Sequence, residues 1–393
     1  MTDKIKIHTE FEQLDDGIYF QLPEDQYHAQ KRISSSGIQS LLISPGTFWH
    51  RSPLNPDYAK NEAKRDPMAR IIGRAYHTAR LEPSMMDNRF AREPHVSEFE
   101  GVLATDAAVK KELKAMGEAQ TKSGELALAR AYRLKEVGYE GDIFSIIMHE
   151  FKESLDGREA VPAEVWDDII RDGERLRSCE AVCEILYNGG SDCGHEVSVF
   201  WTDKEGNKYK CRFDKILPDR FIDLKTFANS MGKELMQNLN DAFQYNRYYI
   251  QGSHYFNGSE VVRTSDLPVI GNAEEKALIK SIRANPLPLQ PYFLFQEKGG
   301  IPNILMKRYR IFNIHYSDAD ADHMGVDNLY ELAVHHNHRS AIYMKAQVEI
   351  QQAVKQYNRY MEVYGENEPW FPLDNAVTDF DDLDFNPYWL GVK

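Results

Sequence analysis

Hydrophobic residues recur every three or four positions through the first half of this 393-residue chain, which predicts a succession of helices. One is expected over residues 34–50, because serines at its start can cap it and Pro45 ends or kinks it. A second follows Pro67 and ends near Leu81, and helical spacing continues from about residue 99 to residue 187. The first half is therefore expected to be largely helical.

Alternation with a period of two begins after residue 194 and predicts strands. Residues 196–201 and 208–213 flank the turn sequence DKEGN and should form a hairpin, followed by a short strand at 221–225. The remaining expected elements are a helix over about 230–255, strands over 291–296 and 304–311, and one or two helices within 327–364. This order predicts an α/β protein whose mixed central sheet is flanked by helices, with helical additions at both ends.

Three segments are predicted. Residues 1–30 mix short apolar runs with turn residues and are interpreted as an N-terminal extension, and residues 31–370 form one large domain. Residues 371–393 form an acidic, aromatic tail with five acids and no base between Asp374 and Asp384. We expect this tail to be loosely held, and we hypothesise that it docks a partner or shields a binding groove.

Composition narrows the class of protein. With 42% hydrophobic and 27% charged residues the chain is typical of a globular protein, and its net charge of −14 argues against a simple basic nucleic-acid coat. Four cysteines are too few for a disulfide scaffold. There is no apolar run long enough to span a bilayer, and the mean hydropathy is −0.56. We expect a cytoplasmic protein without a membrane anchor.

Three charged residues are placed where strand geometry would bring them together. Asp223 and Lys225 share one face of a predicted strand, while Leu224 points into the core. Asp214 ends the neighbouring strand. Two carboxylates beside an ammonium suit Mg²⁺ or Mn²⁺ better than zinc, and such a site fits phosphodiester hydrolysis, with Lys225 orienting the water. A surface salt bridge is the alternative, since this spacing also arises by chance.

The strand order, the Asp-x-Lys spacing and the following helix resemble the core of the PD-(D/E)XK nucleases. Asp214 matches the first acid, and Asp223-Leu224-Lys225 matches the second acid and the catalytic lysine. Two departures are that the second acid is Asp rather than the commoner Glu, and that Pro218 follows Asp214 instead of preceding it. The resemblance implies a restriction-endonuclease-like core with its catalytic strands and helix over residues 194–256.

A glutamine and a tyrosine on the predicted helix extend the resemblance. Gln244 and Tyr248, four residues apart, resemble the Gln-x-x-x-Tyr motif of the RecB-like branch, and Gln251 and Tyr255 continue the same helical stripe. In that branch the helix backs the metal site and contacts the DNA backbone. Gln244 and Tyr248 are therefore interpreted as part of the catalytic machinery.

Two upstream strings narrow the resemblance further. ISSSGIQSLLISPGTFWH (residues 33–50) and IGRAYHTARLEP (residues 72–83) resemble the opening of phage and prophage exonuclease VIII (RecE-type) nuclease domains. Glu196 matches a less constant acidic position that contacts metal or substrate. The implied metal ligands are His77, Asp214, Asp223, the Leu224 carbonyl and Glu196.

The resemblance implies a Mg²⁺-dependent exonuclease, with Mn²⁺ as an alternative ion, that degrades double-stranded DNA from its ends in the 5′-to-3′ direction. It further implies phage-type recombination with a single-strand-annealing partner, and a ring-like homo-oligomer. A structure- or site-specific endonuclease and a non-catalytic DNA-binding protein on a nuclease fold stay open as alternatives. The basic residues expected to line a DNA groove are Lys60, Lys64, Arg65, Arg70 and Arg74 near His77, and Lys208, Lys210, Arg212 and Lys215 near Asp214.

Overall fold

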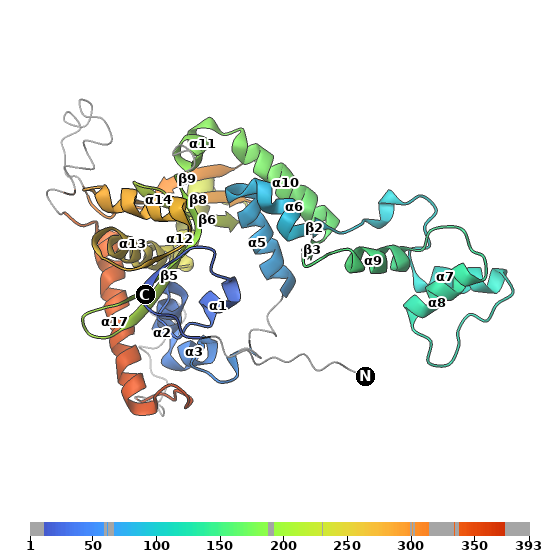
Figure 1. Ribbon diagram of the computed structural model, residues 1–393, viewed down its shortest axis with the longest axis horizontal. Coiled ribbons are helices and arrows are strands. Elements are labelled where there is room, and N and C mark those ends of the chain that lie inside the picture. The colour runs from blue at the N-terminus through green and yellow to red at the C-terminus, as the bar shows by residue number, and fades with distance from the viewer. Residues whose placement is uncertain are drawn as a thin grey trace, which may run out of the picture.

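The computed structural model describes residues 12–58, 61, 67–187, 192–229, 231–298, 301, 303–313, 334 and 338–373. At its centre is a seven-stranded sheet with the strand order β7-β1-β4-β5-β6-β8-β9. Figure 1 labels four of these strands, β5, β6, β8 and β9. β4 (Gly194–Thr202), β5 (Lys208–Ile216) and β6 (Arg220–Phe227) are successive antiparallel neighbours. β8 (Gln290–Glu297) pairs in parallel with β6, and β9 (Ile304–Arg308) closes the sheet antiparallel to β8. The predicted α/β class with a mixed central sheet flanked by helices is confirmed.

The N-terminal segment contributes to this sheet. β1 (Gly17–Tyr19) pairs with β4 and with β7 (Val269–Ile270), and Ile18 is fully buried. α1 (Glu24–His28) follows, and its Tyr27 ring stacks on Phe200 of β4. The described part of the first thirty residues thus contributes a strand to the sheet and buried side chains to the core, in contrast to the predicted extension. A three-residue strand is too short for alternation to reveal it.

Helices cover both faces of the sheet. α5 (Pro67–Leu81), α10 (Ala163–Arg177) and α11 (Glu180–Tyr187) pack against Ile222, Leu224 and Leu294 on one face. The helices that pack on the other face are α2 (Ser35–Ile43), α3 (Pro45–Arg51), α12 (Leu235–Tyr245), α13 (Tyr248–Thr264), α14 (Ala273–Ala284) and α17 (Ala341–Tyr364). The period-two pattern of β6 therefore directs Leu224 to one face, as predicted, and Asp223 and Lys225 to the other.

The helix expected over residues 230–255 is two helices. α12 ends at Tyr245, and Arg247 adopts a left-handed backbone conformation with φ 50° before α13 begins at Tyr248. Gln244 and Tyr248 therefore belong to different helices, contrary to the prediction that they share one helical stripe. No glycine or proline marks this break in the sequence.

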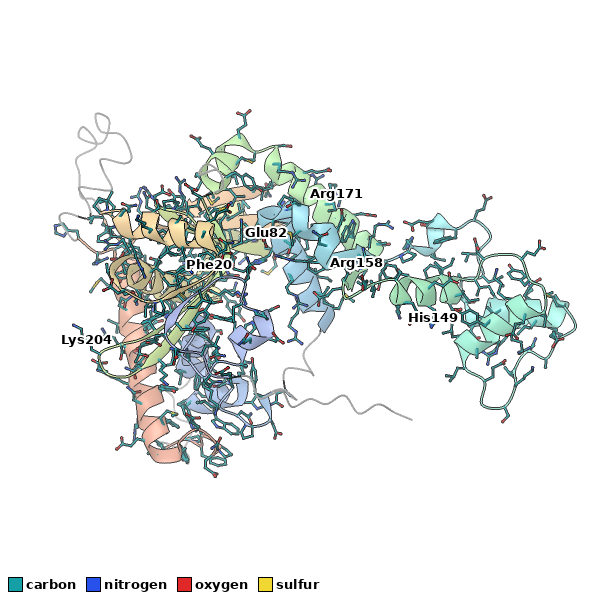
Figure 2. All side chains as sticks on the ribbon, viewed as in Figure 1. Phe20, Glu82, His149, Arg158, Arg171 and Lys204 are labelled. Atoms are coloured by element: carbon teal, nitrogen blue, oxygen red, sulfur yellow. The ribbon has the colours of Figure 1, made fainter. Side chains whose placement is uncertain are left out.

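Residues 93–158 form a lobe that projects from the body of the molecule (Figure 1). Its helices have a hydrophobic core of their own, which includes Val109, Leu113, Ala131 and Leu134; His149 belongs to this lobe (Figure 2). The helices of the lobe are η2 (Val96–Glu98), α7 (Asp106–Ala115), α8 (Ala127–Glu136) and α9 (Phe144–Glu153). The short η1 (Pro83–Met85) and α6 (Met86–Arg89) precede it. β2 (Phe90–Arg92), before the lobe, pairs in parallel with β3 (Glu159–Val161), after it. The pairing of β2 with β3 closes the base of the lobe.

Candidate metal centre

The site opens where β5 and β6 part. These strands pair only through Lys215–Ile222 and Ile216–Phe221. Beyond that point the backbone N–H of Leu224 has no strand partner on this side, and it donates to Asp214 Oδ2 at 2.8 Å. The divergence therefore leaves room for the Asp214 carboxylate between the two strands, and the Leu224 N–H holds that carboxylate by a charge-assisted hydrogen bond.

Three potential ligands meet at this opening. One ligand atom from each of His77, Glu196 and Asp214 lies within 4.8 Å of the others. His77 reaches the site from α5, with Nδ1 3.4 Å from Asp214 Oδ2. His195 and Val197 pair with Lys215 and Phe213, so Glu196 lies opposite Asp214 across the β4–β5 ladder.

The backbone of Glu196 is unusual for a strand residue. Its φ is 51°, in the left-handed region that glycine favours, although it lies within β4. Such a conformation costs about 1–3 kcal/mol and persists only where the surrounding structure enforces it. It occurs at the residue whose carboxylate joins the ligand cluster, and the Arg212 Nε lies 2.9 Å from that carboxylate.

Asp223 and Lys225 form a second part of the site on β6. Lys225 Nζ lies 2.5 Å from Asp223 Oδ2, and Gln251 Nε2 of α13 donates to Asp223 Oδ1 at 2.6 Å. The ammonium of Lys225 is also 5.0 Å from the centre of the Tyr248 ring. Tyr248, the first residue of α13, therefore lies beside Lys225 through a cation–π contact, and its catalytic role stays a prediction.

The acidic groups are held in an environment that disfavours their charge. Burial, and next the charge of Asp214, raise the pKa of Glu196 to about 8, although the Arg212 guanidinium opposes the shift. Burial also raises the pKa of Asp214. The pKa of Asp223 is raised to about 6, again mainly by burial, with Lys225 opposing. A cluster of carboxyl groups that is short of positive charge is one that a divalent cation would stabilise.

The pKa values of the two basic groups, His77 and Lys225, shift in opposite directions. Burial, and next the Lys225 ammonium, lower the pKa of His77 to about 4, so the imidazole is neutral at physiological pH, as a metal ligand must be. The pKa of Lys225 is raised: burial alone would lower it, but the Asp223 and Asp214 carboxylates outweigh burial. Two carboxylates and one neutral imidazole fit a divalent ion, with Mg²⁺ favoured by the oxygens and Mn²⁺ tolerant of the nitrogen.

Four of the six described basic residues that were predicted to line a DNA groove are buried or paired within the protein. Lys210 is buried and donates to the backbone carbonyls of residues 27, 28 and 30 at 2.8–3.0 Å. Lys215 is 3% exposed, Arg212 pairs with Glu196, and Arg74 pairs with carboxylates of α1 and β3. Arg70 and Lys208 are exposed. Lys60, Lys64 and Arg65 lie outside the described residues, as does most of the acidic tail, residues 374–393.

The other predicted residues are placed as follows. Leu224 contributes the N–H that binds Asp214, and the role of its carbonyl as a ligand stays a prediction. Gln244 is exposed on α12, and its side chain makes no hydrogen bond with another described residue. The glutamine that contacts the Asp223 carboxylate is Gln251 and not Gln244, the glutamine of the predicted motif. Gln251 and Tyr255 are also four residues apart, so the sequence contains the Gln-x-x-x-Tyr motif twice. The two copies differ in that Gln251 and Tyr255 both lie on α13, whereas the helix break separates Gln244 from Tyr248.

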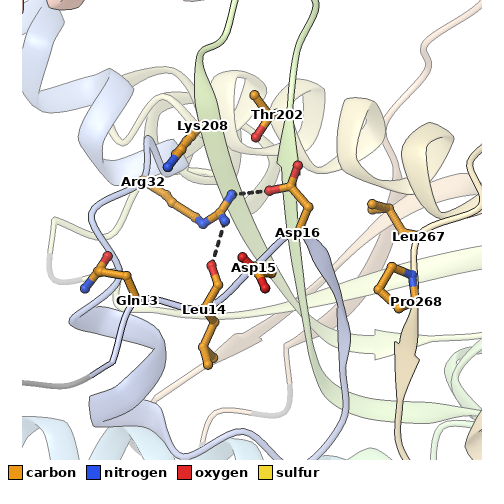
Figure 3. Close-up of a pocket in the computed structure, with 9 residues that line it drawn as sticks. All are labelled: Gln13, Leu14, Asp15, Asp16, Arg32, Thr202, Lys208, Leu267 and Pro268. Carbon is orange, nitrogen blue, oxygen red and sulfur yellow. Dashed lines mark hydrogen bonds and ion pairs between the residues drawn. The ribbon is translucent and has the colours of Figure 1, made fainter.

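A pocket of about 540 Å³ lies at the opposite end of the β4–β5 hairpin (Figure 3). Its most buried cation, Arg32, is already paired: Nη1 lies 2.7 Å from Asp16 Oδ1 and Nη2 donates to the Leu14 carbonyl at 2.8 Å. Thr202 and Lys208, at the far ends of these strands from Glu196 and Asp214, line the same pocket. It is therefore separate from the metal centre and does not share its ligands.

Comparison with known proteins gives little further information. No protein-family model matches the chain, and no curated protein matches it. A solved structure of a protein from Eubacterium rectale, provisionally described as an exonuclease, aligns over 93% of this chain and 98% of its own, with 15% identity and a TM-score of 0.39. Among the described residues there is no helix long and apolar enough to cross a bilayer.

Proposed function

We propose that this chain is a Mg²⁺-dependent deoxyribonuclease, able to use Mn²⁺, that degrades double-stranded DNA from its ends. The observation that carries the proposal is the meeting of His77, Glu196 and Asp214 within 4.8 Å, beside the Asp223–Lys225 pair on the next strand. Carboxylates and an imidazole around a divalent ion, with a partly buried lysine adjacent, form a donor set suited to phosphodiester hydrolysis.

Each residue has a role that follows from its contacts. A bound divalent ion would acidify a water molecule and neutralise charge on the phosphoryl oxygens. Asp214 is held for this task by the Leu224 N–H, and Asp223 by Gln251. Lys225, kept protonated by the neighbouring carboxylates, orients the attacking water or offsets negative charge on the phosphate. The water oxygen bonds to phosphorus, the P–O bond to the leaving nucleoside breaks, and a proton passes to the leaving oxygen.

The finer assignment is proposed on the sequence resemblance. It comprises a 5′-to-3′ polarity, a part in phage-type recombination with a single-strand-annealing protein, and a ring-like homo-oligomer around DNA. A basic groove receives less support, because Lys210, Arg212, Lys215 and Arg74 are engaged within the protein. Phosphate contacts are therefore assigned first to the metal site and Lys225.

The test is digestion of end-labelled linear duplexes, with and without a 5′ phosphate, beside a covalently closed circle. We expect Mg²⁺-dependent loss of the linear duplex from its 5′ strand and an intact circle. Asp223→Ala and Lys225→Ala should abolish cleavage, whereas Asp266→Ala and Lys204→Ala, at exposed positions outside the site, should not. Full activity in either site variant would contradict the proposal.

The same assay separates the alternatives. Nicking of the closed circle would identify an endonuclease. Absence of cleavage together with absence of divalent-ion binding would identify a non-catalytic DNA-binding protein on this fold, and would refute the proposed reaction.

A further inference from the structure

A pocket of about 360 Å³ lies between α12 and the strands β8 and β9. Its lining is Leu239, Asn240, Phe243, Gln244, Phe293, Phe295, Lys307, Arg308, Tyr309, Arg310 and Ile342. This is within the size range of small-ligand pockets. There is no carboxylate among these lining residues, although acids outnumber bases in the chain by 61 to 47.

The strand register places this pocket on the same face of the sheet as the Asp223–Lys225 pair, on the two strands next to β6. Asp223 on β6 pairs with Phe293 on β8, and Phe293 pairs with Lys307 on β9. Lys225 pairs in the same way with Phe295. All of these side chains lie on one face of the sheet, since they occupy equivalent positions in neighbouring strands. With strands about 4.8 Å apart, Lys307 lies roughly 10 Å across the sheet from Asp223.

Aromatic rings connect the two sites without a gap. The Lys225 ammonium is 5.0 Å from the Tyr248 ring, and that ring stacks on Phe293 with centroids 6.1 Å apart. Tyr248 is also 6.2 Å from Phe295, and Phe293 contacts Phe243 of α12 edge-to-face at 5.7 Å. Phe293 and Phe295 are buried, whereas Tyr248 and Phe243 are partly exposed, so these two rings are the part of the row that a strand of nucleic acid leaving Lys225 could contact.

The polar groups of the pocket also match one ligand. Lys307 and Arg310 form no side-chain hydrogen bond or ion pair with another described residue, so both cations are available to a phosphate. Asn240 and Gln244 are exposed on α12 and offer amide donors and acceptors. Tyr245, beside them at the end of α12, is 88% exposed.

We propose that this pocket binds an unpaired nucleobase of the DNA strand whose phosphodiester lies at the metal centre. The inference deepens the proposed nuclease function and rests on it for the identity of the ligand. Single-stranded nucleic acids are bound by aromatic side chains that stack on bases and by cations that contact the backbone. A base inside a duplex has its edge occupied by its pairing partner and its faces covered by the bases stacked on it, so the occupant is an unpaired nucleotide that has left the stack, with Phe243 stacking on the base and Lys307 contacting a phosphate.

The test is binding of a short fluorescent oligothymidylate, measured by anisotropy with the full-length protein in EDTA, so that no cleavage occurs. We expect Lys307→Gln to weaken binding several-fold and to reduce the dependence of log Kd on log salt by about 0.7, the effect of one lost contact to a single strand. Phe243→Ala should weaken binding about ten-fold or more. Lys204→Gln, in the turn of the β4–β5 hairpin (Figure 2), is the matched control and should leave both quantities unchanged.

Two results would overturn the inference. One is a Kd and salt dependence of Lys307→Gln equal to those of Lys204→Gln. The other is that Lys307→Gln and Phe243→Ala lose as much affinity for a blunt duplex as for the single strand, because the pocket would then not select unpaired bases. Mg²⁺-dependent cleavage by the wild-type protein is measured in parallel. Cleavage without a Lys307 effect refutes the pocket alone, and a Lys307 effect without cleavage supports the pocket and refutes the nuclease proposal.

Discussion

Gln251 is expected to be a positioning residue of the reaction, and its replacement by alanine tests the geometry of the site. Its amide donates to Asp223 Oδ1 at 2.6 Å, and Asp223 is 2% exposed. A hydrogen bond to a buried, charged acceptor contributes about 1.5–3 kcal/mol, because no water replaces it when it is removed. If the hydrogen bond stabilises the transition state but not the ground state, its loss slows cleavage by roughly 10- to 150-fold.

The pH dependence gives a second measure of the same effect. Donation by the amide favours the ionised form of Asp223, whose pKa is already raised to about 6 by burial. Without that donor the pKa of Asp223 should rise further, and the acid limb of the rate profile should move to higher pH. Gln251→Glu keeps the size of the side chain but adds a like charge, so it should move the limb in the same direction and further.

The assay is Mg²⁺-dependent cleavage of an end-labelled duplex between pH 5.5 and 9, with thermal unfolding as the measure of folding. Gln237→Ala, at an exposed glutamine of α12, is the matched control. A normal rate and an unshifted pH profile in Gln251→Ala would refute the positioning role. A lower rate with an unshifted profile and a lower melting temperature would show a merely structural effect.

Three further predictions concern the metal and the acids. His77→Ala should weaken Mn²⁺ binding about ten-fold or more in calorimetric titrations, while His149→Ala in the lobe (Figure 2) should not; equal affinities would contradict the ligand assignment. Because the pKa of Glu196 is about 8, metal binding at pH 7 should release about one proton, and the affinity for the metal should increase as the pH rises to about 8. The number of protons released is obtained from calorimetric titrations in buffers of different ionisation enthalpy. Without metal, folded Asp223 retains a proton, with a pKa of about 6, that the unfolded chain loses near 3.8. The stability of the wild type relative to Asp223→Asn should therefore fall by about 2 kcal/mol between pH 4 and pH 6, measured by urea unfolding.

Local patterns were sufficient to predict the strands that carry Asp214, Asp223 and Lys225. The DKEGN turn and the alternation around it predict the β4–β5 hairpin, and the Asp-x-Lys spacing predicts that Asp223 and Lys225 share a face. The structure has both features. These are properties of neighbouring residues, so they can be inferred before the chain is folded.

Features that depend on distant contacts could not be predicted. The break between α12 and α13 occurs at Arg247, an ordinary helix former, so only the packed structure shows which Gln-x-x-x-Tyr pair reaches Asp223. Lys210 resembles a surface lysine in the sequence, yet it donates to the Gln30 carbonyl 180 residues away. The participation of residues 17–19 in the sheet likewise depends on β4 and β7.

The most direct test of the metal centre is titration of the full-length protein with Mn²⁺ followed by electron paramagnetic resonance, which distinguishes free from bound ion. We predict that the wild-type protein binds Mn²⁺, that Mg²⁺ displaces it, and that the double variant Glu196→Gln, Asp214→Asn loses this binding while keeping its fold. Circular dichroism and thermal unfolding establish that the variant is folded. Equal Mn²⁺ binding by the wild type and the folded double variant would contradict the assignment of His77, Glu196 and Asp214 as the metal centre.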